Sequence, residues 1–277
     1  MPLSILISEY WYFILLIICV AAAVGFFAGL FGIGGGLISV PCLFFLFETL
    51  NIEKEYLMHL TVGTAFTITI FTSSASVFTH YKNKLVDLSV VKTFGLFVVI
   101  GVILGIIFAS LMTTKNLVLF FSVIVYFFGA YLMLSTEKIK KIKVNRALFS
   151  KALFGLMSGF ISAPMGITGA MINVPLLRYL GYPISKCIGT AAAIGLFISF
   201  TGSIGFLISG FYFSVNLPFS VSFVNIPAIL LFVPITTFMA RYGANTVYKM
   251  NKVKAQRLFG VFLYAVGTIF IYRFFNI

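Results

Sequence analysis

The chain has 277 residues, of which 61% are hydrophobic and only 9% are charged. That composition leaves too little polar surface to cover a water-soluble globule, so we expect an integral membrane protein. A membrane-crossing helix needs about 20 apolar residues, so the length allows about ten spanning or half-spanning helices and excludes an appended soluble domain. The net charge of +13 would suggest nucleic acid as the partner of a soluble protein. In a membrane protein it indicates basic cytoplasmic loops, and no nucleic-acid partner is expected.

Ten apolar segments follow one another along the chain and are expected to be helical. They cover residues 10–33, 37–47, 57–79, 90–111, 117–135, 149–166, 170–180, 187–208, 219–240 and 258–276. Two divisions, after the first and the sixth segment, fall at Gly-rich breaks without a polar loop. The first two segments of each group of five are therefore expected to form a hairpin or a broken helix. The fold class is an all-α integral membrane protein.

The loops between these segments alternate in charge. Sixteen of the nineteen Lys and Arg residues lie in the stretches 80–92, 136–151, 178–186 and 241–257. The positive-inside rule assigns these stretches to the cytoplasm. The other three basic residues, Lys54, Lys115 and Arg273, then lie outside, and both termini are expected to be external.

An internal repeat relates the two halves of the chain. Residues 25–43 match residues 159–177 at nine of nineteen positions without a gap, and residues 62–65 and 188–191 share the pattern (V/I)GTA. Each half holds five segments, and an odd number turns the second copy upside down. We therefore expect a first repeat over 1–135, a basic cytoplasmic connector over 136–148 and a second, inverted repeat over 149–277. Inverted repeats are typical of secondary transporters that bind their substrate near the bilayer midplane.

The Gly-rich breaks are the candidate binding site. Gly32–Gly36 and Gly166–Ala170 are each followed, five residues after the break, by Pro41 or Pro175, so helices should stop and restart there. A restarting helix presents unpaired N–H groups and the positive end of its dipole, which suit an anion. The backbone of both breaks is expected to line the site: Gly34, Gly35 and Gly36 in the first, and Thr168, Gly169 and Ala170 in the second.

Four polar side chains at matching positions of the repeat are expected to complete the site. Ser39 and Asn173 lie one turn into the restarted helices, and Thr64 and Thr190 occupy the GTA stretches. The alternative for any single hydroxyl is a hydrogen bond to its own backbone or to a neighbouring helix. Arg241 could attract an anion from the cytoplasm or simply anchor the topology.

Charged and titratable residues narrow the choice of substrate. No Asp or Glu lies inside an expected span, which argues against cation transport and proton relays. His59 begins the third segment and is expected at the membrane interface.

The break GLFGIGGG followed by Val40-Pro41, its copy ending in Asn173-Val174-Pro175, and the two GTA stretches resemble the TauE/SafE family of sulfite exporter-like permeases. The resemblance covers nearly the whole chain, although Thr168 and Ala170 replace two glycines of the first break. It implies secondary transport of sulfite or small organosulfonates, such as isethionate or sulfoacetate, across the bacterial cytoplasmic membrane.

Three rival functions follow from the same residues. They are transport of another small carboxylate or inorganic anion, an intramembrane enzyme, and a membrane scaffold. The enzyme is disfavoured because the sequence holds no nucleophile turn of the GxSxG type, no HExxH and no intramembrane carboxylate pair. We expect no cofactor and no metal site. A small anionic solute and the lipid bilayer are the expected partners, while a homodimer and a coupling proton or sodium ion are left open.

Overall fold

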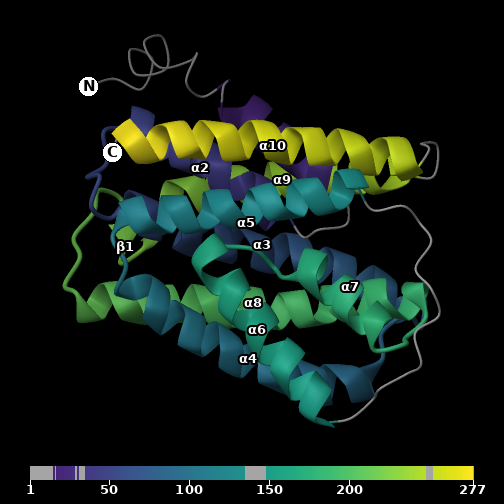
Figure 1. Ribbon diagram of the computed structural model, residues 1–277. Helices are drawn as coiled ribbons and strands as arrows, with labels where there is room; N and C mark the ends of the chain where they lie inside the picture. Colours follow the sequence, from purple (N-terminus) through teal and green to yellow (C-terminus); the bar gives the residue numbers. More distant parts are fainter. Residues whose placement is uncertain are drawn as a thin grey trace.

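The computed structural model describes residues 15, 17–28, 30, 35–134, 148–247 and 252–276, and these residues are almost entirely helical (Figure 1). The expected all-α fold class is confirmed. The helices are Ile17–Ala28, α2 (Gly36–Thr49), α3 (Leu57–Lys82), α4 (Leu88–Ser110), α5 (Thr114–Leu134), α6 (Leu148–Met165), α7 (Ala170–Tyr179), α8 (Ile184–Tyr212), α9 (Ile226–Val247) and α10 (Lys252–Asn276). Two short strands, β1 (Ser220–Val221) and β2 (Val224–Asn225), form a hairpin before α9.

Seven of these helices are long and apolar enough to cross a membrane: α3, α4, α5, α6, α8, α9 and α10. Helices α2 and α7 are shorter than a span, and so is the described part, Ile17–Ala28, of the N-terminal helix. Every expected apolar segment contains one described helix. The short helices fall where the Gly-rich breaks were expected to interrupt a crossing.

The ninth segment begins later than expected. Residues 219–225 were assigned to its helix, but they form the β-hairpin and the turn before it. Phe219 and Ser222 have positive φ angles of 52° and 57°, which a helix cannot contain. Apolar residues on both sides of this turn made the hairpin look like the start of the helix.

Helices of the two halves pack against one another. The central pair is α3 and α8, which are antiparallel. Helix α5 packs against α10. In addition, α4 packs against α8, while α9 packs against α3. Exchanging each helix for its counterpart in the sequence repeat leaves this set of contacts unchanged.

Small residues also allow α4 and α6 to approach each other closely. A Cβ atom built at Gly159 would overlap the carbonyl oxygen of Val98, and one at Gly101 would overlap that of Leu156. Backbone-to-backbone contact of this kind is how helices associate in lipid, where apolar side chains gain nothing by leaving the surroundings. The N-terminal helix approaches α9 in the same way, because a Cβ atom at Gly25 would lie 2.6 Å from Thr236 Cα.

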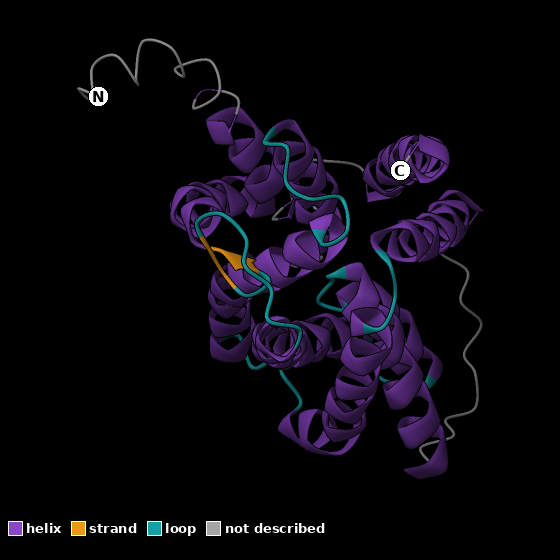
Figure 2. Ribbon diagram, turned by 90° about the vertical axis from the view of Figure 1, so that its left-hand side faces the viewer, coloured by secondary structure: helices purple, strands orange, loops and turns teal. Residues whose placement is uncertain are grey.

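Contacts between loops and helix ends lie at two opposite ends of the molecule. At one end, the Arg273 guanidinium pairs with the Glu48 carboxylate at 3.1 Å, joining the last turns of α10 and α2. The β-hairpin lies at this same end, which is at the left of Figure 1 and faces the viewer in Figure 2. At the other end, Lys186 Nζ donates to the Lys84 carbonyl at 2.8 Å. Residues expected on the same side of the membrane are thus in contact.

Candidate functional site

At both breaks the helix restarts after a glycine whose backbone conformation only a residue without a side chain adopts easily. Gly35 precedes α2 with φ +85°, and Gly169 precedes α7 with φ +66°. No side chain caps either helix start. The first N–H groups of α2 and α7 are consequently left without helical partners, as the sequence predicts. Gly34, also expected at the site, lies outside the described residues.

The two breaks touch each other inside the protein. A Cβ atom at Gly36 would overlap the carbonyl oxygen of Gly166 and lie 2.9 Å from Ile167 Cα. Thr168 and Ala170 are buried beside this contact, with exposed fractions of 1% and 6%. The backbone residues that were predicted from two distant parts of the sequence are therefore brought together.

Ser39 and Asn173 are the buried polar side chains of these restarted helices. Their exposed fractions are 1% and 0%. Among the residues that the structure describes, Ser39 Oγ and Asn173 Nδ2 have no hydrogen-bond partner. An unpaired buried polar group costs about 1–3 kcal/mol, so its presence at both matching positions calls for a functional explanation.

Thr64 and Thr190 have a different place from the one expected. Thr64 Oγ1 accepts a hydrogen bond from the Asn225 N–H at 3.0 Å, and Thr190 Oγ1 accepts one from the Asp87 N–H at 3.0 Å. Each threonine thus joins its own half to the residue that precedes α9 or α4 in the other half. Asp87 and Asn225 in turn cap those helices through their side-chain oxygens.

These two threonines cannot both contact one small anion. Gly63 of α3 lies against Phe206 of α8, so Thr64 is at the level of Phe206. Thr190 lies well over a dozen residues from Phe206 along α8. At 1.5 Å per residue this is a separation of about 20 Å. Their expected convergence on one site is corrected, and their hydroxyls hold the two halves together.

Hydroxyl pairs between α3 and α8 were not foreseen as contacts. Thr67 Oγ1 and Ser203 Oγ lie 2.7 Å apart, and Thr69 Oγ1 donates to Ser199 Oγ at 3.0 Å. The sequence signal was the crowding of Ser and Thr in the third and eighth segments. These bonds fix the register of the two central helices, α3 and α8, which pack next to both breaks.

His59 is buried among protein side chains near the start of α3. Its ring is 3% exposed, stacks on Phe223 with centroids 5.1 Å apart, and places Nε2 3.1 Å from the Ala109 carbonyl oxygen. The β-hairpin that carries Phe223 covers this end of α3. This cover could not be read from the sequence, and the level of His59 at the membrane interface stays a prediction.

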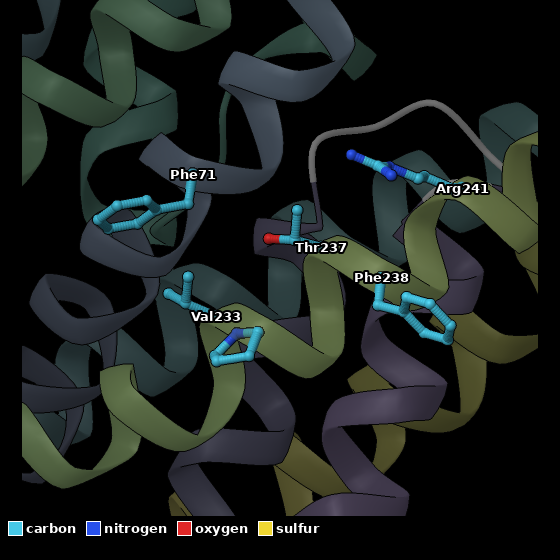
Figure 3. Close-up of a pocket in the computed structure, with 6 residues that line it drawn as sticks. Phe71, Val233, Thr237, Phe238 and Arg241 are labelled. Atoms are coloured by element: carbon cyan, nitrogen blue, oxygen red, sulfur yellow. The ribbon is translucent and has the colours of Figure 1, made fainter.

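Arg241 lines a groove of about 360 Å³ between α3 and α9 (Figure 3). Phe71, Val233, Pro234, Thr237 and Phe238 form the rest of the lining. Figure 3 shows the guanidinium group extending over the Thr237 side of the groove. Of the break residues that the structure describes, none lines the groove, and a role of Arg241 in attracting anions stays a prediction.

Seven membrane-length helices, with two breaks in contact inside the protein, define a polytopic membrane protein. The family model described as Sulfite exporter TauE/SafE matches residues 17–270, and the chain belongs to this family. It is therefore a membrane transporter and not an enzyme.

Curated relatives agree with this assignment. A probable membrane transporter protein of Haemophilus influenzae is 28% identical over 92% of this chain and 97% of its own length. Another, from Methanocaldococcus jannaschii, is 29% identical over 88% of each chain. A third, YunE of Bacillus subtilis, is 24% identical over 94% of this chain and 98% of its own length. No solved structure matches the chain significantly.

Proposed function

We propose that the protein is a secondary transporter of sulfite or C2 organosulfonates, such as isethionate or sulfoacetate, in the cytoplasmic membrane of a bacterium. The observation that carries the proposal is the pair of buried polar atoms without partners, Ser39 Oγ and Asn173 Nδ2. Each lies one turn into a helix that begins at a glycine with positive φ. The family description, Sulfite exporter TauE/SafE, supports a sulfur oxyanion as the substrate.

The charge of the site favours a monoanion. A helix N-terminus carries roughly half a positive charge, so two of them offset about one negative charge without a buried Lys or Arg. Bisulfite and isethionate carry one charge. Sulfoacetate carries two, and it would need a further cation such as Arg241, or a coupled proton or sodium ion. The seven membrane-length helices contain no Asp or Glu to neutralise a cationic solute.

The mechanism we propose is alternating access by two inverted halves. Ser39 and Asn173 are buried, so a solute can reach them only when helices move. The halves meet at the two breaks and along α3 and α8, which allows one half to rock against the other around a central site. The matched threonine contacts to Asn225 and Asp87 support this internal symmetry.

The sidedness of this mechanism is a separate prediction, with both termini external. Lys54 and Lys84 are exposed at opposite ends of α3, in loops assigned to the outside and the cytoplasm. After replacement of the free cysteines Cys19, Cys42 and Cys187, a membrane-impermeant thiol reagent should label Lys54→Cys in intact cells but not Lys84→Cys. Labelling of Lys84→Cys alone would reverse the assigned orientation.

The proposed substrate class is tested by equilibrium binding to the purified protein. We expect sulfite and isethionate to raise the unfolding midpoint in detergent, since a ligand at 100 times its Kd adds about 2.7 kcal/mol to stability. Choline should have no effect. Stabilisation by acetate and by neither sulfur anion would move the protein to the carboxylate alternative. A membrane scaffold would respond to none of these solutes.

A further inference from the structure

The two helix starts have similar backbone at Gly35 and Gly169 but different side chains around them. In the sequence repeat, Val24, Ala28 and Ser39 of the first half correspond to Ser158, Ser162 and Asn173 of the second. All six residues lie within the described part of the chain and all are buried. At each of the three positions the second half has the side chain with the greater hydrogen-bonding capacity.

The substituted side chains surround the glycines that start the helices. A Cβ atom at Gly169 would lie 2.9 Å from Ser162 Oγ and 3.1 Å from Asn173 Nδ2. The same atom at Gly35 would lie 3.1 Å from the Ala28 methyl carbon, with Ser39 Oγ 3.9 Å away. The Cβ side of Gly169 therefore faces two polar groups beside Ile198 Cδ1 at 2.7 Å, while that of Gly35 faces a methyl group and one hydroxyl.

Ser158 fixes the direction of the Asn173 amide. Its hydroxyl donates to Asn173 Oδ1, so the acceptor end of the amide is occupied. The donor end, Nδ2, is left without a partner among the described residues. Ser162 donates its own proton to the Ser158 carbonyl at 2.6 Å, which adds a second hydroxyl to the same cluster. The two N–H groups of Asn173 are thus presented next to the start of α7, where the N–H groups of Ala170 and Met171 also lack helical partners.

We infer that the anion is bound asymmetrically, with its oxyanion group at the second break and its uncharged side at the first. This inference rests on the proposed function and names the half-site that recognises charge. Asn173 and the start of α7 supply directed N–H donors for sulfonate or bisulfite oxygens. Ser39, with the methyl group of Ala28 nearby, faces the part of the solute that carries no charge. Ser158 is a positioning residue, because it acts on the anion only through Asn173.

The test compares matching positions of the repeat by the affinity of purified protein for sulfite and isethionate. Asn173→Ser gives the second break the side chain of the first, and we expect it to raise both Kd values at least tenfold. Ser39→Ala should raise the Kd of sulfite by a smaller factor than Asn173→Ser does. Asn173→Asp keeps the shape and the bond from Ser158 but removes both N–H donors, and it should abolish binding.

Ser158→Ala should weaken sulfite binding several-fold in the wild-type background and not at all in the Asn173→Ser background. A purely structural role of Ser158 would weaken binding equally in both backgrounds and would overturn the positioning role. If wild-type protein binds sulfite and the Ser39 and Asn173 variants lose equal affinity, the asymmetric site is wrong and the proposed function stands. Absence of sulfur-anion binding by wild-type protein would overturn both.

Discussion

Replacing Gly169 by leucine should abolish transport while the protein still reaches the membrane. The backbone at Gly169 has φ +66°, a conformation that costs a residue with a side chain about 1–2 kcal/mol. The new Cβ atom would also lie 2.7 Å from Ile198 Cδ1 and 2.9 Å from Ser162 Oγ. The rest of the leucine side chain would occupy the space in which Asn173 is expected to meet the anion. Gly35→Leu should have the same effect, because its φ is +85°.

The matched control is a buried glycine that has room for a side-chain atom. A Cβ atom at Gly95 of α4 would make only ordinary contacts, at 3.5 Å from Ile194 Cγ1 and 3.8 Å from Val91 Cγ1. Gly95→Ala should therefore transport at the wild-type rate, while Gly169→Ala falls at least tenfold. Initial uptake rates at equal protein density in proteoliposomes decide the comparison. Wild-type rates in both Gly35→Leu and Gly169→Leu would mean that the site lies elsewhere.

Gly159→Leu should prevent assembly of the transporter. A Cβ atom at this position would overlap the Val98 carbonyl oxygen and lie 2.7 Å from the Val102 nitrogen, both in the backbone of α4. Backbone cannot turn aside as a side chain can, so α4 and α6 would have to separate along the contact that joins the halves. Overpacking alone typically costs about 1–3 kcal/mol, and loss of this helix contact adds to it.

The measurement is the yield of monodisperse protein after extraction in mild detergent. Met157→Leu is the control on the same helix, because Met157 is 51% exposed on the outer surface. It should match the wild-type yield, whereas Gly159→Leu should give aggregated or degraded protein. Recovery of both variants in equal amounts would show that the close approach of α4 and α6 is not required.

The sequence predicts the helices, the breaks and the backbone of the site because each has a local signal. Apolar runs set the spans, and glycines followed by proline set the points where α2 and α7 begin. The pairing of Ser39 with Asn173 also follows from the repeat. The repeat does not show how far apart matching residues lie in space. Thr64 lies near the start of α3 and Thr190 near the start of α8, and because these helices are antiparallel the two residues are far apart.

Residues covered by distant parts of the chain could not be placed from the sequence. His59 is buried because Phe223 of the β-hairpin stacks on it from more than 160 residues away in the chain. The hairpin itself lies in a largely apolar stretch that is interrupted by Asn216, Pro218, Ser220, Ser222 and Asn225 without a clear turn motif. The role of Ser158 was likewise missed, since a lone serine in a membrane helix more often bonds its own backbone.

Uptake of labelled isethionate into proteoliposomes tests the central claim, that the paired breaks carry a small monoanion of sulfur across the membrane. Sulfite, acetate, chloride and choline serve as competitors, with empty liposomes and Gly169→Leu protein as backgrounds. We predict saturable uptake that sulfite suppresses, that chloride and acetate affect weakly, and that choline leaves unchanged. Competition mainly by choline, or uptake by Gly169→Leu protein at the wild-type rate, would contradict the account.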